Sequence, residues 1–103
     1  MKYKIGIKTA AEKDMRNIYR YISETLKEPA IAKRLYGSQK KAIQSLKDNP
    51  MRHAVIEDEP FFSQGIRRLY IGNYTAFYIV DDANRQVQVL NVIYSRRDWQ
   101  NLL

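Results

Sequence analysis

The sequence predicts an α+β fold, in which a small antiparallel sheet carries a two-helix hairpin on one face and ends in a short helical tail. Residues 66–94 contain three strand-like runs in series, residues 9–48 show helical spacing of apolar residues, and residues 2–8 alternate between polar and apolar. The expected order is strand, helix, helix, three strands and tail. The length of 103 residues fits one domain, residues 1–103.

The three C-terminal strands form the most distinct part of this pattern. Their runs are IRRLYI at 66–71, YTAFYIV at 74–80 and QVQVLNVIY at 86–94. Val, Ile, Tyr and Phe, which suit a half-buried pleated surface, dominate them. Only residues 72–73 and 81–85 separate the runs. Because connections this short join antiparallel neighbours, we expect an antiparallel meander.

The first half of the chain reads as one strand and two helices. Thr9 and Glu12 have the spacing of a capping box, so a helix is expected to begin with Thr9 as its N-cap. Pro29 ends this helix and suits the first turn of the next, which stops before Asn49-Pro50. The two helices are expected to cover one face of the sheet and to leave the other face open.

Residues 49–65 are expected to form a loop. The adjacent Phe61 and Phe62 are expected to fold back under it as a small apolar cluster, although exposed aromatics beside the acidic residues 57–59 are the alternative. His53 is the only histidine of the chain. A lone histidine in such a loop is expected at the surface.

The chain carries a net charge of +7 and has a pI near 9.7. A positive field of this kind attracts phosphate polymers, acidic proteins or anionic membranes, and a merely soluble surface is the plain alternative. All nine lysines lie at or before Lys47, whereas every cation after residue 53 is an arginine. Because the guanidinium fork grips phosphate with two hydrogen bonds, we expect a site for nucleic acid or an acidic partner on the sheet.

Several classes of function are disfavoured by what the sequence lacks. It contains no cysteine, one histidine, no P-loop and no G-x-G-x-x-G motif, so we expect no metal site and no cofactor. No apolar run approaches 18 residues, and no hydrophobic leader follows the N-terminus. Together with the absence of cysteine, these features favour the cytoplasm.

Tyrosine and arginine are the residues left to carry chemistry. Strand alternation places Arg68 with Tyr70 on one face, and Arg96 and Arg97 follow Tyr94. Such a surface can stack bases and neutralise phosphates. It can also cleave RNA without a metal, when the 2′-hydroxyl attacks the phosphate, an arginine stabilises the charge and a tyrosine moves protons. The alternative is that these tyrosines are ordinary strand residues and the arginines an ordinary surface pair.

The order of elements, the size and the charge resemble the toxins of the RelE/ParE superfamily, which belong to type II toxin–antitoxin modules. The residues that carry the resemblance are Ala11-x-x-Asp14, Ile18-x-x-Tyr21-Ile22, Asn49-Pro50, Gly65-Ile66-Arg67-Arg68-Leu69, Asn73-Tyr74-x-x-Phe77-Tyr78-x-Val80 and Val92-Ile93-Tyr94-x-Arg96-Arg97-Asp98. The resemblance covers nearly the whole chain. It implies a protein that arrests growth and that a co-expressed antitoxin neutralises by wrapping the helices and sheet.

The resemblance leaves three activities open. RelE-like members enter the ribosome and cut mRNA, ParE-like members inhibit DNA gyrase without being known as nucleases, and an inactive relative would only bind antitoxin. The sequence favours the first, a metal-independent endoribonuclease, since the high charge and the Tyr-x-Arg-Arg ending suit a site built of phosphate. The first helix and the entry Gly65-x-Arg67-Arg68 lean towards the second activity.

Transferring the nuclease site to this chain gives a defined set of residues. Tyr94, Arg68 and Arg96 become the catalytic candidates, and Arg67, Arg97 and Tyr74 become the RNA- or phosphate-binding candidates. Nucleases of this group usually carry an arginine directly after the residue that opens the second meander strand, and here that position is Thr75. Because threonine cannot stabilise the phosphorane charge, this departure weighs against full activity, with a cost of ~100-fold or more.

Overall fold

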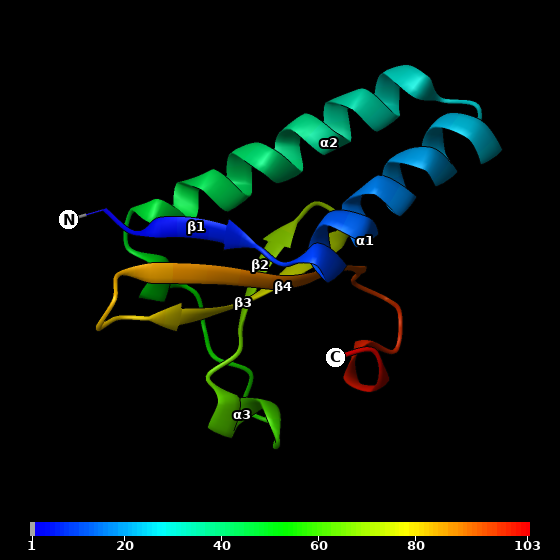
Figure 1. Cartoon of the computed structure of the whole chain (residues 1–103). Helices are drawn as coiled ribbons and strands as arrows, with labels where there is room; N and C mark the ends of the chain where they lie inside the picture. Colours follow the sequence, from blue (N-terminus) through cyan, green and yellow to red (C-terminus); the bar gives the residue numbers. More distant parts are fainter. Residues whose placement is uncertain (1) are drawn as a thin grey trace.

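The computed structural model describes residues 2–103 and contains a four-stranded sheet in the order β1-β4-β3-β2 (Figure 1). The strands are β1 (Lys4–Ile7), β2 (Arg67–Ile71), β3 (Tyr74–Asp81) and β4 (Gln86–Tyr94). The last three form the predicted antiparallel meander. β1 instead pairs with β4 in parallel, so the sheet as a whole is mixed rather than antiparallel. The long helical connection after β1 makes this parallel pairing possible.

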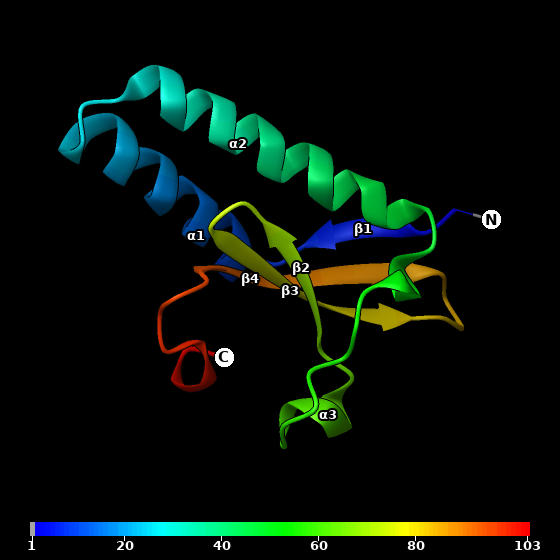
Figure 2. The same ribbon diagram turned by 180° about the vertical axis from the view of Figure 1, so that it is seen from behind.

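Two helices form the predicted hairpin. They are α1 (Thr9–Arg20), which continues as a π-helical turn (Tyr21–Thr25), and α2 (Pro29–Gln44), which continues as a 3₁₀ turn (Ser45–Lys47). Figures 1 and 2 show both helices on one side of the sheet. Pro29 opens α2 as expected. The predicted capping box is wrong, because Lys8 is the N-cap and no side chain caps α1. The chain enters the helix directly after β1, which leaves Thr9 already within its first turn.

The hairpin encloses the larger of two hydrophobic clusters against the sheet. Its buried members come from both helices, from the 3₁₀ turn and from the three C-terminal strands: Ala11, Met15, Ile43, Leu46, Leu69, Ile71, Ala76, Tyr78, Val87, Val89 and Val92. Burial of this apolar surface is what holds the hairpin on the sheet.

The other face of the sheet is covered rather than open. Ile56, Phe61 and Ile66 pack against Phe77 and Ile93 of the sheet, and the C-terminal tail packs against the same cluster. The predicted tail, residues 95–103, follows β4 and contains a 3₁₀ turn (Trp99–Asn101). Its Trp99 ring lies 5.4 Å from that of Phe77 and 5.6 Å from that of Phe61. Figure 2 shows this cover, α3 and the tail, on the side away from the hairpin. The expectation of an open face was wrong because aromatic residues distant in sequence assemble there.

The aromatic pair in the predicted loop is divided by a short helix, α3 (Phe61–Gln64). Phe61 is buried in the second cluster, whereas Phe62 is exposed. Successive side chains on a helix point in directions about 100° apart, so one turn cannot bury both neighbours. Of the two phenylalanines, only Phe61 therefore joins the expected apolar cluster.

The loop before α3 is fastened to the sheet by two side chains. Arg67 Nη1 donates hydrogen bonds to the carbonyls of Met51 and His53, at 3.1 and 2.6 Å, and the Tyr78 hydroxyl donates to the Pro50 carbonyl. His53 is consequently half-buried rather than a surface residue, and its ring meets that of Tyr78 edge-on at 6.4 Å. Among residues 2–103, no helix is long and apolar enough to cross a membrane.

The central position of Phe77 gives a test of the covered face. Phe77 is fully buried, so we expect Phe77→Ala to lower the free energy of unfolding by about 3–5 kcal/mol. Tyr70 lies on the same face of the neighbouring strand but is 64% exposed, so Tyr70→Ala is a matched control with a loss of at most about 0.5 kcal/mol. Urea unfolding measures both. Equal losses would contradict the covered face.

The burial of His53 gives a test by pH. Desolvation lowers the pKa of His53, and the guanidinium groups of Arg52 and Arg67 lower it further. The unfolded chain protonates this group near pH ~6.5, whereas the folded chain does so only at lower pH. The folded state thus binds fewer protons, and the free energy of unfolding falls as the pH drops below that value. We expect His53→Phe to lose less stability than the wild type between about pH 7.5 and 5.5 in urea unfolding. An identical pH dependence would contradict this assignment.

Candidate functional site

A groove with a volume of ≈ 780 Å³ lies between the helical hairpin and the end of the sheet where β4 stops. One wall comes from α1, the π-helical turn and the start of α2, and the other from the sheet and the tail. The lining residues are Asp14, Asn17, Ile18, Tyr21, Ile22, Leu26, Glu28, Ile31, Tyr74, Asn91, Val92, Ile93, Tyr94, Arg97 and Leu102.

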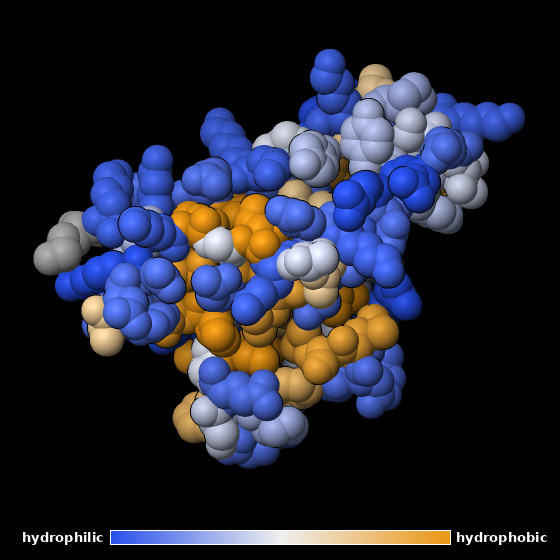
Figure 3. All heavy atoms as spheres, viewed as in Figure 1, coloured by the Kyte–Doolittle hydropathy of each residue, from blue (hydrophilic) through white to orange (hydrophobic). Residues whose placement is uncertain are grey.

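The groove is largely apolar although it is open to solvent. Ten large hydrophobic side chains are exposed among the described residues, and five of them line this groove: Tyr21, Leu26, Ile31, Tyr94 and Leu102. Figure 3 shows hydrophobic atoms near the C-terminal tail, beneath a hairpin whose exposed atoms are mostly hydrophilic. Exposed apolar side chains gathered in one concave region mark a site for binding another molecule.

The π-helical turn shapes the hairpin side of the groove. Leu26 N–H donates to the Tyr21 carbonyl at 3.1 Å, five residues back, instead of four. This wider turn changes the direction of the side chains relative to α1, and such turns occur often at functional sites. It presents Tyr21 and Leu26 to the groove.

Asp14 joins α1 to the irregular part of β4. Its Oδ2 accepts hydrogen bonds from the Val92 backbone N–H at 2.9 Å and from Asn91 Nδ2 at 3.1 Å. These two residues lie just after the register shift between β3 and β4. A bulge of this kind leaves backbone donors without a strand partner, and the carboxylate supplies one. Asp14 therefore fixes the strand end that carries Tyr94.

Tyr74 and Tyr94 form the sheet end of the groove. They are directly paired across β3 and β4, so both side chains point to the hairpin face, and their rings meet edge-on at 5.5 Å. Burial raises the pKa of Tyr74, and the phenols of Tyr94 and Tyr21 raise it further. The Tyr74 phenol is therefore protonated at neutral pH and is suited to donate a hydrogen bond.

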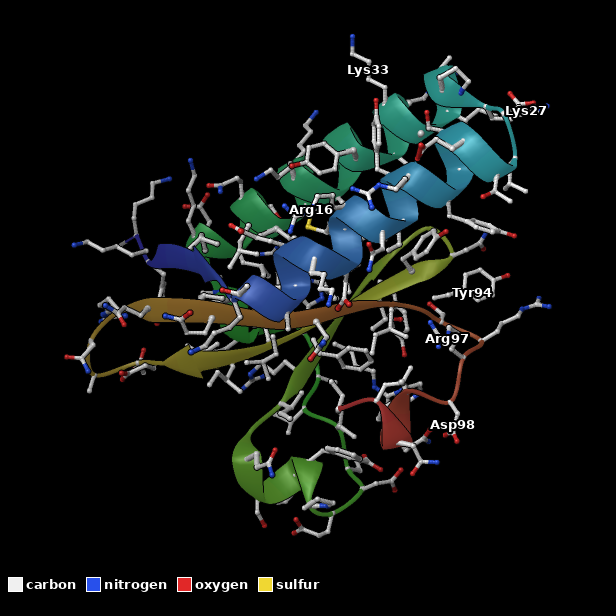
Figure 4. The ribbon with its side chains drawn as sticks, turned by 45° about the vertical axis from the view of Figure 1, so that its right-hand side comes forward. Arg16, Lys27, Lys33, Tyr94, Arg97 and Asp98 are labelled. Carbon is white, nitrogen blue, oxygen red and sulfur yellow. The ribbon has the colours of Figure 1, made fainter. Side chains whose placement is uncertain are left out.

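Arg97 brings a positive charge to the same groove. Its backbone N–H donates to the Tyr94 carbonyl at 2.9 Å, and this turn redirects the chain so that Arg97 lines the groove. Figure 4 shows Tyr94 and Arg97 on the same side of the molecule. Arg96 is exposed beside it in the tail. Three of the sequence-predicted site residues, Tyr74, Tyr94 and Arg97, are thus brought together.

The arginines of β2 lie elsewhere. Arg68 is paired with Phe77, whose side chain belongs to the cluster on the other face, and its guanidinium lies over the Trp99 ring at 4.9 Å. The Arg67 guanidinium is hydrogen-bonded to the loop carbonyls described above. The structure therefore does not bring the β2 arginines to Tyr94.

Thr75 gives no polar group to the groove. It is buried, shares the face of Phe77 through strand alternation, and its Oγ1 lies 2.7 Å from Ser95 Oγ. This hydrogen bond joins β3 to the start of the tail. The sequence marks Thr75 as the position where the site lacks an arginine, whereas its side chain is buried in the interior.

Comparison with known families assigns the chain to a family. Residues 5–99 match the family described as the ParE toxin of the type II toxin–antitoxin system parDE. The chain belongs to this ParE toxin family. Its match covers nearly all of the described residues, which confirms the superfamily that the sequence motifs indicated. No protein of curated function matches the chain in sequence.

Solved structures confirm the fold. The chromosomal ParDE system from P. aeruginosa gives a TM-score of 0.72 at 19% identity, covering 89% of this chain and 95% of that one. The RelBE2 toxin–antitoxin complex from Mycobacterium tuberculosis gives 0.65 at 21% identity, covering 91% and 99%. The archaeal RelE–RelB complex from Pyrococcus horikoshii gives 0.65 at 18% identity, covering 94% and 99%. Since both kinds of toxin share the fold, the fold alone does not separate their mechanisms.

The Asp14 anchor gives a direct test of how the groove is built. We expect Asp14→Ala to lower the free energy of unfolding by about 1–3 kcal/mol, because it leaves the Val92 N–H and the Asn91 amide without their acceptor. Glu24→Ala is the control, since Glu24 is exposed and meets Arg20 only at 3.8 Å. Its expected loss in thermal or urea unfolding is at most about 0.5 kcal/mol. Equal losses would remove Asp14 from this role.

Proposed function

We propose that this ParE-family toxin arrests growth by binding its target without cutting RNA, in the manner of the ParE-like members that inhibit DNA gyrase. The observation that carries the proposal is the separation of the charged groups that cleavage would need. Tyr94 lies on the hairpin face of the sheet, whereas Arg68 lies on the other face over Trp99.

Cleavage without a metal requires its groups to converge on one phosphate. A proton-transfer group and at least one cation must reach the same reacting atoms at hydrogen-bond distance. In this chain Arg67 is committed to loop carbonyls and Thr75 to Ser95. Of the cations predicted for the site, Arg97 lines the groove of Tyr94. This set suits recognition of a partner better than stabilisation of a phosphorane.

We further propose that a co-expressed antitoxin neutralises the toxin by laying an apolar segment along the groove. The related solved structures from M. tuberculosis and P. horikoshii are toxin–antitoxin complexes. Tyr21, Leu26 and Ile31 supply the apolar contacts here, and Arg97 supplies a cation for an acidic residue of the segment. Gyrase, ribosome and mRNA would all place the action of the toxin in the cytoplasm.

The second candidate is ribosome-dependent mRNA cleavage, which the sequence favoured. The exposed phenol of Tyr94 beside Tyr74 and Arg97 supports it, with Arg96 as a further cation in the tail. In this mechanism Tyr94 moves the protons and the tail arginines hold the phosphate. It requires Arg96 and Arg97 alone to replace the strand arginine that nucleases of this group usually carry at the position of Thr75.

Induction of the chain alone, with pulse labelling of DNA and protein synthesis, separates the candidates. We expect thymidine incorporation to fall first, with a DNA-damage response, while methionine incorporation continues. Tyr94→Phe is the matched variant, since it removes one hydroxyl and keeps the ring contact with Tyr74. It should stay toxic if the toxin acts by binding, and should lose toxicity if Tyr94 transfers protons.

Two outcomes would contradict the proposal. An early fall in methionine incorporation that Tyr94→Phe abolishes would establish the nuclease instead. No change in either label, with the protein present and folded, would make the chain an inactive relative that only binds antitoxin.

A further inference from the structure

A second cleft, with a volume of ≈ 670 Å³, lies between α1 and α2 on the flank of α1 that faces away from the groove. Glu12, Arg16 and Tyr19 line it from α1, and residues 33, 36 and 40 line it from α2. Residues three and four apart share one flank of a helix, so this set lies opposite the one formed by Asp14, Asn17 and Tyr21. Figure 4 shows Arg16 and Lys33 on the side of the hairpin away from Tyr94 and Arg97.

Two tyrosines form an aromatic pair in this cleft. The rings of Tyr19 and Tyr36 meet edge-on, with centroids 6.0 Å apart and planes at 82°. Each residue is 38% exposed, so neither is a core residue. The Lys40 ammonium lies 5.8 Å from the Tyr36 ring centroid. The cleft therefore offers aromatic surface and a cation side by side.

The charge of the cleft is positive and not neutralised. Within residues 2–103, none of Arg16, Lys33 and Lys40 forms an ion pair, and Glu12 is the one acidic residue among the lining residues. The surrounding segment 8–41 holds nine lysines and arginines against four acidic residues. The field here therefore favours a polyanion.

We propose that this cleft binds single-stranded nucleic acid. Arg16, Lys33 and Lys40 would contact successive phosphates, and an unpaired base would stack on the Tyr19–Tyr36 pair. Exposed aromatic rings among cations suit unpaired bases, whose faces are free, whereas the bases of a duplex are already stacked. Contacts to phosphates and to base faces do not distinguish ribose from deoxyribose, so DNA and RNA strands are both ligands. The inference concerns a surface separate from the groove and does not depend on the proposed function.

Fluorescence anisotropy with the purified full-length chain tests the proposal. The probes are labelled oligo-dT and oligo-U strands of about twelve nucleotides, the range of a single-strand site. We expect both to bind, and the double variant Lys33→Ala, Lys40→Ala to bind more weakly. Its plot of log K against log salt should be shallower by about 1.4, since each phosphate contact on a single strand contributes about 0.7.

Two further variants separate specific binding from general charge. Lys4→Ala with Lys47→Ala removes the same charge from exposed lysines outside the cleft, and we expect the salt slope to stay unchanged. Tyr36→Leu should weaken binding about tenfold without changing the slope, because it removes stacking and no charge. Tyr19→Leu is the second aromatic variant should Tyr36→Leu unfold, as judged by circular dichroism.

The following results would contradict the proposal. Equal losses of affinity in the two lysine double variants would show that the binding comes only from the overall positive field. If a duplex binds as tightly as the single strands, or if an aromatic variant folds and binds like the wild type, bases do not stack on the tyrosines. Failure of the wild type to bind either strand at low salt would overturn the proposal as a whole.

Discussion

The structure depends on the burial of the central strand β3 from both sides. Ala76, Phe77 and Tyr78 follow one another and are all fully buried, so consecutive side chains enter two different cores. The helical hairpin covers one face, and α3 with the Trp99 tail covers the other (Figures 1 and 2). Both faces of the middle of this strand are therefore covered. The groove lies at the end of the sheet, where β3 begins with Tyr74 and β4 ends with Tyr94, and the second cleft lies on the hairpin.

Helix α1 contributes side chains to both the groove and the second cleft. One stripe packs on the sheet through Ala11 and Met15, and Asp14 holds the bulged end of β4 in place. The flanks on either side of that stripe differ in chemistry. One contributes Tyr21 to an apolar groove, and the other contributes Arg16 to a basic cleft. Under the two proposals, a protein partner would contact one flank of this helix and a nucleic acid the other, without competing for one site.

The sequence predicted the elements well because the signals for them are local. Short turns after residues 71 and 81 define the meander, and Pro29 separates the helices. The site depended on information that is not local. Strand alternation placed Arg68 with Tyr70, but the pairing of Arg68 with Phe77 and of Tyr74 with Tyr94 decides that Arg68 and Tyr94 face opposite ways. The partner of Asp14 likewise exists only once β4 has its bulge, and the covered second face requires Trp99 to meet Phe77 across the fold.

The central claim, that the toxin binds its target without cutting RNA, is tested most directly in a reconstituted translation system. Purified toxin is added to ribosomes that carry a defined mRNA, and primer extension maps the ends of that mRNA. We expect the mRNA to stay full-length at toxin concentrations that inhibit supercoiling by purified gyrase. New mRNA ends that depend on ribosomes and disappear with Tyr94→Phe, together with unaffected gyrase, would contradict the account and return the catalytic role to Tyr94.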